Sequence, residues 1–274
     1  MKNLISVLFV GDIVGQPGLD ILALKLPELK EQYKSDFTIV NGENAAAGRG
    51  ITEVESKQIF NAGADVITTG NHVWDSWKGK PLLASDAQIV RPMNYPSGNV
   101  GKGYVVCETE DGVKIAVLQL QGRTYMQTID CPFKTAEYAV KQHLEPKTNI
   151  IIVDFHADAT GEKIALGWFL DGSVSAIIGT HTHVPTADAT ILPNGTGFIS
   201  DVGMTGPYDS VLGLRKEVAI KRLTLQTPHK YEIAEKDPRL CAVHLLINVH
   251  TGQTIKIEQI IIPKYERTVQ YDCE

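Results

Sequence analysis

The sequence predicts an α/β fold in which two mixed sheets form a sandwich flanked by helices. Apolar, strand-like runs alternate with helical spacing in the first half of the chain, which is typical of a parallel sheet with right-handed crossovers. Paired strand signals separated by short turns follow later and indicate antiparallel hairpins. A mixed two-sheet sandwich accounts for both patterns better than a single parallel sheet.

The first half is expected to form a β-α-β-α-β unit. The second helix of this unit should begin after Thr52, because Glu55 stands three residues later and completes a capping box. This helix should end near Asn61. The strands are expected at residues 4–10, 37–41 and 65–69, and the first helix at residues 19–33.

The second half changes pattern and is expected to contain two hairpins. The turn at residues 110–112 joins the first, and the turn at 250–252 joins a terminal one. The less regular segment from Thr205 to Pro238 is interpreted as a small cap or an oligomer contact. The remaining strands are expected at residues 103–109, 113–120, 149–155, 174–178, 187–192, 197–199, 241–249 and 254–262, with helices at 135–144 and 161–170.

Composition limits the class of protein. The 274 residues show no repeat or flexible linker, so one domain spanning 1–274 is the simpler interpretation. A net charge of −6 argues against stable binding of duplex nucleic acid, although it leaves room for a local cationic site that holds a small nucleotide. The four cysteines, which are widely dispersed, favour reduced thiols in a cytoplasm.

Membrane insertion and secretion are not indicated by the sequence. No stretch approaches the roughly 20 apolar residues that a membrane helix needs. The short apolar run at residues 4–10 is interpreted as a first strand, because it lacks the features of a signal peptide.

Two histidines separated by one residue give the strongest functional signal. His181 and His183 follow the apolar run 174–178, and side chains at i and i+2 of an extended segment point the same way. Other ligand-type residues also follow strand-like runs, and in open α/β sheets ligands bind beyond the carboxyl ends of the strands. The candidate metal ligands are Asp12, Glu43, Asn44, Asn71, His156, His181 and His183.

Seven nitrogen and oxygen donors are too many for one tetrahedral zinc ion and fit two metal ions that share a carboxylate. Only Asp12 and Glu43 among them carry negative charge, so two divalent ions leave the site positive. This balance favours an anionic substrate such as a phosphate ester. Two adjacent metal ions can activate a water molecule and clamp phosphoryl oxygens. The donor types suit iron, manganese, cobalt and zinc alike.

His72 adjoins Asn71 and is assigned as a general acid that protonates the leaving oxygen. Arg49, Arg91 and Arg123 are candidates for holding a phosphate. Simpler interpretations exist for single residues: Asp12 could cap a helix, and Asn71 could occupy a turn. The remaining histidines, His143, His229, His244 and His250, are interpreted as structural.

Three motifs carry a family resemblance. Gly11-Asp12, Gly70-Asn71-His72 and the segment 179–183 resemble the calcineurin-like metallophosphoesterase superfamily. Val14 stands where that superfamily usually has a histidine, and Glu43-Asn44 replaces its usual bridging aspartate motif. Both departures match the YmdB-like bacterial branch, as do the segments 121–123, 154–160, 182–188 and 201–210.

The resemblance implies a fold, a ligand scheme and an activity. One metal would be held by Asp12, Glu43, Asn44 and His183, and the other by Glu43, Asn71, His156 and His181. Glu43 would bridge the two ions, and His72 would be the proton donor. The metal would be iron, with manganese able to substitute. The implied enzyme is a cytoplasmic homo-oligomer with the calcineurin-like fold that hydrolyses cyclic nucleotides, above all 2′,3′-cyclic nucleotides to 3′-nucleotides.

Two other functions remain open at this stage. A phosphomonoesterase would keep the same metals and differ only in the pocket. A regulatory binding protein would use the metal site as a ligand sensor, with slow or vestigial activity. A cellular phenotype that survives Glu43→Gln would favour the regulatory function.

Overall fold

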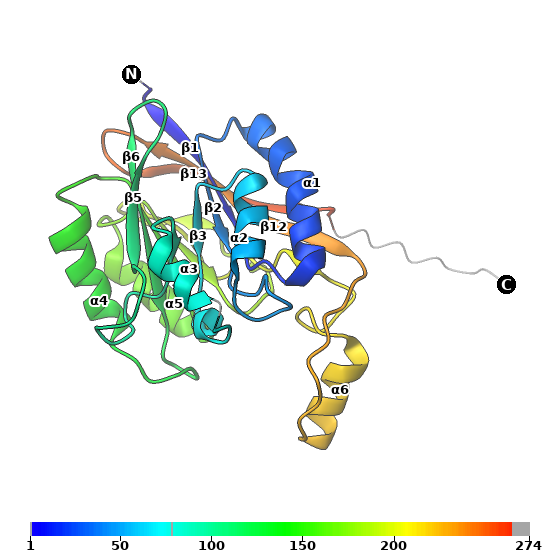
Figure 1. Cartoon of the computed structure of the whole chain (residues 1–274). Coiled ribbons are helices and arrows are strands. Elements are labelled where there is room, and N and C mark those ends of the chain that lie inside the picture. The colour runs from blue at the N-terminus through cyan, green and yellow to red at the C-terminus, as the bar shows by residue number, and fades with distance from the viewer. Residues whose placement is uncertain (1, 78, 265–274) are drawn as a thin grey trace.

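A computed structural model of the chain describes residues 2–77 and 79–264. It contains two mixed sheets flanked by helices, as Figure 1 shows, so the predicted fold class is confirmed. The first sheet contains β1 (Leu4–Val10), β2 (Phe37–Asn41), β3 (Val66–Thr68), β4 (Ile89–Val90), β11 (Gly206–Pro207), β12 (Pro238–Asn248) and β13 (Thr254–Ile262). The second contains β5 (Tyr104–Glu108), β6 (Lys114–Gln121), β7 (Ile151–His156), β8 (Ala176–Thr180), β9 (Thr190–Ile191) and β10 (Gly197–Ile199).

Each sheet contains a run of four parallel strands beside antiparallel ones. The first sheet runs β11-β12-β1-β2-β3-β4, with β13 beside β12, and its β1, β2, β3 and β4 are mutually parallel. The second runs β5-β6-β7-β8-β10-β9, with β6, β7, β8 and β10 parallel. Hairpins β5–β6 and β12–β13 confirm the two antiparallel pairs that the turns predicted.

The core is divided into three apolar layers by the period-two alternation of the strands. In β1, Val7 and Phe9 pack between the two sheets, whereas Leu8 and Val10 face the helices on the outer side of the first sheet. The outer side of the second sheet is covered in the same way (Figure 1). The covering helices are α1 (Gly15–Tyr33) and α2 (Glu53–Asn61) on the first sheet, and α4 (Pro132–Ala139) and α5 (Thr160–Leu170) on the second.

Local signals account for the starts of two helices, α2 and α4. The capping box at α2 is formed as expected: Thr52 accepts from the backbone of Val54, and Glu55 accepts from the backbone N–H of Thr52. Pro132 stands in the first turn of α4, where its missing N–H is not needed. The helix then continues as one π-helical turn over Val140–Leu144.

Several elements differ from expectation. The strand expected over 187–192 is reduced to β9, and the sequence patterns did not predict β4, α3 (Gly79–Ser85) or the 3-10 turn η1 (Asn71–Trp74). The segment 205–238 contains a ten-residue helix, α6 (Lys216–Leu225). Only Ala219 of α6 is buried, so this helix lacks the broad apolar face that marks a helix in a sequence.

Figure 1 shows α6 projecting from the body of the molecule beyond the ends of the strands. None of the helices within the described ranges is long and apolar enough to cross a bilayer. Cys107, Cys131 and Cys241 are free thiols, and Cys273 lies outside the described residues.

Candidate metal centre

The seven predicted ligands gather where the carboxyl ends of both sheets meet. Each parallel strand β1, β2, β3, β7 and β8 delivers a donor at its end or in the loop that follows. Because the two sheets pack face to face, these ends lie together, which brings donors from both halves of the chain to one place. In strand order the donors are Asp12, Glu43, Asn44, Asn71, His156, His181 and His183.

Four of the donors crowd together, with His156 Nε2 at the centre. Glu43 Oε1 lies 2.9 Å away, Asn71 Oδ1 3.0 Å and His181 Nδ1 3.0 Å. Donors at right angles around a metal with bonds of about 2.1 Å stand about 3 Å apart. The spacing of this first group therefore matches the ligand shell of a single ion, and Glu43, His156 and His181 form a metal-ligand cluster by geometry alone.

The second group of donors is more widely spaced. His183 Nε2 lies 3.1 Å from Asn44 Nδ2 and 3.7 Å from Asp12 Oδ2. Asp12 Oδ1 lies 4.0 Å from Nδ1 of His156, which belongs to the first group. A rotation of the Asn44 amide would present its oxygen at the same position. The two groups are thus contiguous, and Asp12 borders both.

Two buried carboxylate oxygens in this cluster have no hydrogen-bond partner among the described residues. Asp12 Oδ1 and Glu43 Oε1 are both buried, and the nearby His156 nitrogen does not meet Glu43 Oε1 in hydrogen-bonding geometry. An unpaired buried carboxylate is unfavourable unless a cation compensates it. The donor set therefore fits metal ions, which would supply the positive charge that these oxygens require.

Burial shifts the ionisation of the donors. It raises the pKa of Glu43 to about 7, and burial together with the charges of Asp201 and Glu43 raises the pKa of Asp12 well above its usual range. Burial also lowers the pKa of His181 to about 2 and that of His183 below its ordinary value. The histidines are therefore neutral, with lone pairs available for a metal.

Gly70 leaves room for the first group. A Cβ atom on this residue would lie 2.0 Å from Glu43 Oε2 and 2.4 Å from the ring of His156. Any other residue would push these donors apart. The glycine of the Gly70-Asn71-His72 motif is therefore required by the packing of the ligands themselves.

His181 and His183 belong to a loop, whereas the sequence predicted an extended segment at the end of a strand. Neither lies on an extended segment: both follow β8 in a loop, with φ of 100° at His181 and 65° at His183. The prediction of a strand-like i, i+2 arrangement was wrong. Positive φ is unfavourable for residues with a side chain, so the surrounding structure must hold this loop in place.

A buried ion pair holds the loop. Asp201 accepts from the backbone and hydroxyl of Thr182, at 2.9 and 2.7 Å, and pairs with Lys163 at 2.7 Å. On the other side, the backbone N–H of His181 donates to Asp12 Oδ2 at 2.8 Å. Asp201 thus fixes Thr182, and Asp12 fixes the backbone of His181.

A second buried carboxylate orients His156. The Thr180 hydroxyl donates to Asp154 at 2.7 Å and lies 2.9 Å from His156 Nδ1. Since its single proton is used, the hydroxyl must accept from His156 Nδ1–H, which leaves Nε2 free to bind a metal. Asn41 and Thr68 also donate to Asp154, and burial raises the pKa of Asp154 to about 7. A lone carboxylate within an apolar strand was the sequence signal that could have revealed this residue.

A chain of side-chain contacts links His72 to Tyr231 through Asp75 and Arg49. His72 Nδ1 lies 2.8 Å from Asp75 Oδ2, and Arg49 Nη1 lies 3.6 Å from the same oxygen. The Arg49 guanidinium also stacks over the ring of Tyr231, 5.3 Å from its centroid. Asp75 was missed in the sequence, although its position three residues after His72 in a short helical turn places the two side chains side by side.

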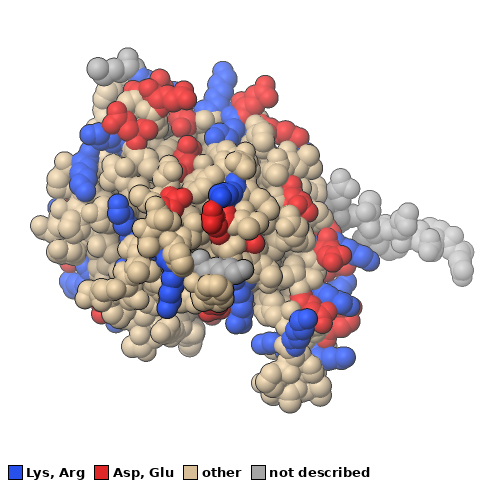
Figure 2. Space-filling view, viewed as in Figure 1, with Lys and Arg blue, Asp and Glu red and all other residues tan. Residues whose placement is uncertain are grey.

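A pocket of about 450 Å³ opens in front of the cluster. His72, Asn44, His181 and His183 line it. Residues of the segment 205–238, including α6, form most of the rest of the lining, and Leu212 O of this segment lies 3.1 Å from His183 Nδ1. Figure 2 shows this segment as a projection at the lower right, tan at its end and charged where it joins the body.

The three predicted arginines are placed differently from one another. Arg49 lies beside Asp75 and Tyr231, near the cluster. Arg91 is buried and donates three hydrogen bonds to the backbone carbonyls of residues 92, 99 and 100, which gives it a structural role. Arg123 is exposed, and its backbone N–H donates to Glu162.

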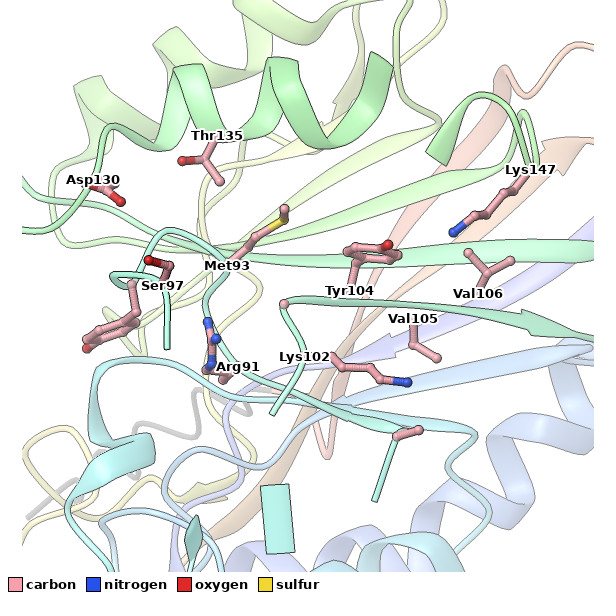
Figure 3. Close-up of a pocket in the computed structure, with 13 residues that line it drawn as sticks. Arg91, Met93, Ser97, Lys102, Tyr104, Val105, Val106, Asp130, Thr135 and Lys147 are labelled. Atoms are coloured by element: carbon pink, nitrogen blue, oxygen red, sulfur yellow. The ribbon is translucent and has the colours of Figure 1, made fainter. Parts of the chain in front are cut away.

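Arg91 lines a different and larger cavity of about 800 Å³, bordered by β5, α4 and the segment that follows β4, shown in Figure 3. Lys102, Tyr104 and Lys147 border this cavity, and none of the seven donors does. The structure therefore does not bring Arg91 to the metal cluster.

Comparison with known proteins identifies the family of this chain. The YmdB-like protein family matches residues 8–260. The chain belongs to the YmdB-like family. A relative from Bacillus subtilis (strain 168), called 2′,3′-cyclic-nucleotide 2′-phosphodiesterase, is 46% identical over 93% of this chain and 96% of its own length. A putative phosphatase/phosphodiesterase of Mycoplasma pneumoniae is 36% identical over 97% of each chain.

Solved structures of similar proteins share the fold of this chain. A hypothetical protein from Thermus thermophilus superposes with a TM-score of 0.88 at 39% identity, covering 94% of this chain and 98% of its own. A novel phosphatase from Mycoplasma pneumoniae gives a TM-score of 0.89 at 35% identity, with 96% and 94% covered. By homology this YmdB-like chain is a hydrolase of the phosphatase and phosphodiesterase type.

Proposed function

We propose that this protein is a dinuclear metal-dependent phosphodiesterase that hydrolyses 2′,3′-cyclic nucleotides to 3′-nucleotides. The proposal rests on two buried carboxylate oxygens, Asp12 Oδ1 and Glu43 Oε1, which have no hydrogen-bond partner among the described residues. They lie in the same cluster as the neutral imidazoles of His181 and His183. The name of the Bacillus subtilis relative, 2′,3′-cyclic-nucleotide 2′-phosphodiesterase, supports the choice of substrate.

The two donor groups would hold one ion each. Glu43 would be shared: its Oε1 lies 2.9 Å from His156 Nε2 of the first group, and Glu43 is the sequence neighbour of Asn44 in the second. Iron is proposed for both positions, with manganese as a substitute. When bound, the ions would supply an activated water molecule and neutralise the charge that develops on the phosphoryl oxygens. The first ion would take Glu43, Asn71, His156 and His181, and the second would take Asp12, Glu43, Asn44 and His183.

His72 is proposed as the general acid. Its Nδ1 is held by Asp75 at 2.8 Å, and its ring lines the pocket in front of the donors. The other nitrogen, Nε2, is therefore the atom that can hand a proton to the departing oxygen. If that oxygen is the ribose 2′ oxygen, the phosphate stays on the 3′ oxygen and the product is a 3′-nucleotide.

Arg49 is the arginine whose position best supports a role in substrate binding. It stands between Tyr231, which lines the pocket, and Asp75, which holds His72. A guanidinium in this place adds positive charge at the edge of a pocket that receives an anion. Arg123 is kept as a further proposal, with less geometric support.

The protein is also proposed to be a cytoplasmic homo-oligomer that does not bind duplex nucleic acid stably. Dispersed cysteines and the net charge of −6 support the location and the lack of duplex binding. Exposed apolar residues on α6, Ile220 and Leu225, offer a surface for contact between subunits. Light scattering of the purified protein tests the oligomeric state.

A phosphomonoesterase is the second candidate, because two relatives carry the word phosphatase in their names. It would use the same donors and differ in what the pocket accepts. Comparing p-nitrophenyl phosphate with bis-p-nitrophenyl phosphate separates the two: faster hydrolysis of the diester supports the phosphodiesterase, and faster hydrolysis of the monoester supports the alternative.

The deciding experiment joins metal content to product identity. Elemental analysis of freshly purified protein should give about two metal ions per chain, and the same preparation should convert 2′,3′-cyclic AMP to 3′-AMP. Two bound ions without turnover would support the metal site and indicate that the substrate is another phosphoester. No metal after reconstitution with iron or manganese would overturn the proposed function.

A further inference from the structure

The pocket in front of the donors has two chemically different walls. One carries the amide and imidazole groups of Asn44, His181 and His183. The rest of the lining comes mainly from residues 205–238, which we call the cap segment, and this cap wall is dominated by apolar side chains, with Arg222 as the one charged group among its described residues. The apolar members of this cap wall are Val211, Leu212, Leu214, Ala219, Leu223 and Tyr231.

The apolar side chains of the cap wall do not belong to the hydrophobic core. Leu223 is 68% exposed and Leu212 is 49% exposed, so neither contributes much buried area to the fold. Within the described part of the chain, none of the three core clusters contains a residue of the cap wall. Phosphate chemistry does not need apolar groups opposite the metal donors. Such a surface at the mouth of a polar site is typical of one that binds the apolar part of a ligand.

Tyr231 gives the cap wall a fixed aromatic ring. The Arg49 guanidinium stacks on this ring, and a Cβ atom at Gly48 would lie 3.0 Å from Tyr231 Cε1. The ring is thus packed against the loop that carries Asn44. Its position relative to the donors is set by direct contact with the ligand-bearing loop, which makes it suited to orienting a substrate.

We propose that the cap wall binds the nucleobase of the substrate, with Leu223 and Tyr231 contacting the base while the phosphate lies at the donors. This inference rests on the proposed function. A nucleobase has a flat face that stacks on aromatic rings and packs on aliphatic side chains. A pocket of about 450 Å³ falls in the range that holds ligands of this size. Because apolar groups contact every base alike, the cap wall favours nucleotides over small phosphodiesters without selecting one base strongly.

Leu223 and Leu24 form a matched pair for testing the inference. Both are exposed leucines on helices, Leu223 at 68% on α6 and Leu24 at 59% on α1, and only Leu223 lines the pocket. Neither substitution to alanine removes core packing, so both variants should fold. Turnover of 2′,3′-cyclic AMP is compared with that of glycerol 1,2-cyclic phosphate, which has the same strained ring and no base.

Leu223→Ala is expected to lower kcat/KM for 2′,3′-cyclic AMP about fivefold, through KM, and to leave the base-free substrate unchanged within about twofold. Leu24→Ala should leave both substrates unchanged. Calorimetry with 3′-AMP and glycerol phosphate, on protein loaded with Mn²⁺, should show the same pattern in Kd without requiring turnover.

Equal losses for both substrates in Leu223→Ala, or no loss for either, would overturn the inference. So would wild-type protein that hydrolyses glycerol 1,2-cyclic phosphate as efficiently as 2′,3′-cyclic AMP. Suppose that neither cyclic phosphate is hydrolysed, but that Leu223→Ala alone weakens the binding of 3′-AMP. The proposed phosphodiesterase activity would then be wrong, and the proposed base site would be supported. If 3′-AMP binds no better than glycerol phosphate, the base site fails whatever the activity.

Discussion

The two walls of the pocket differ in how the protein holds them. The donor wall comprises the metal donors: Asn44, His181 and His183 line the pocket, and Asp12, Glu43 and His156 are buried behind them with no exposed surface. The three buried donors stand at or just after the ends of strands. On the cap wall, Leu223 stands on a helix of which only Ala219 is buried. Groups that must converge on metal ions require positions fixed to a fraction of an ångström, whereas apolar recognition tolerates a looser support.

This contrast predicts that substitutions on the donor wall affect catalysis by orders of magnitude, and that those on the cap wall affect substrate selection by small factors. The largest effect is expected for Glu43→Gln. The amide keeps the shape of the side chain but removes the charge that both proposed ions share. Turnover should fall more than about 10³-fold, and elemental analysis should show loss of metal from one or both positions.

Glu108→Gln is a suitable control for this variant, because Glu108 is an exposed residue at the end of β5, the edge strand of the second sheet. It should retain full metal content and activity. Full turnover in Glu43→Gln with two bound metal ions would contradict the shared-carboxylate arrangement.

His72→Ala is expected to have the next largest effect. General acid catalysis contributes about 10²–10⁴ to a rate, so kcat should fall by about 10³ while the metal content stays at its wild-type level. Steady-state kinetics with 2′,3′-cyclic AMP and elemental analysis on the same sample measure both. His250→Ala, an exposed histidine bonded to Asn3, serves as the control. Unchanged turnover in His72→Ala would remove this residue from the mechanism.

The donors themselves could be found from the sequence because the rule that locates them is topological. Asp12, Glu43 and Asn71 follow apolar runs, and parallel strands bring their carboxyl ends to one edge wherever the sheet forms. The sandwich adds the second sheet, and with it His156, to the same edge. Pattern and topology suffice for this part of the site, since no precise backbone geometry is needed to state it.

Other parts of the site depend on geometry that no local pattern encodes. The positive φ angles at His181 and His183 result from contacts of the loop with Asp201 and Asp12, which lie elsewhere in the chain. Helix α6 buries only Ala219, so its sequence lacks the apolar periodicity that would predict a helix. Its position beside the site is therefore seen only in the folded structure. Asp201 opens the segment 201–210 that resembles the family, but that resemblance does not indicate which residue supports the metal ligands.

Thr180→Val tests how far the donor wall depends on its supports. Valine keeps the shape of threonine but removes the hydroxyl that accepts from His156 Nδ1–H and donates to Asp154. Loss of such a partner typically weakens metal affinity about 10–100-fold, so a shift of about that size is expected in a Mn²⁺ titration. Thr190→Val, on the exposed strand β9, should leave the titration unchanged. An unaltered affinity in Thr180→Val would show that His156 is oriented by packing alone.

The smallest effect is expected where the two walls meet, at Arg49. Its side chain is 51% exposed and its ion pair with Asp75 is 3.6 Å long, so the pair adds little stability and Arg49→Gln should fold normally. If the guanidinium attracts the phosphate, KM for 2′,3′-cyclic AMP should rise about threefold with kcat nearly constant, and the dependence of KM on salt should weaken. Arg215→Gln, at the surface of the cap segment beside Glu232, is the control. A fall in kcat at constant KM would instead mean that Arg49 acts on His72 through Asp75, which places it with the donor wall rather than with substrate recognition.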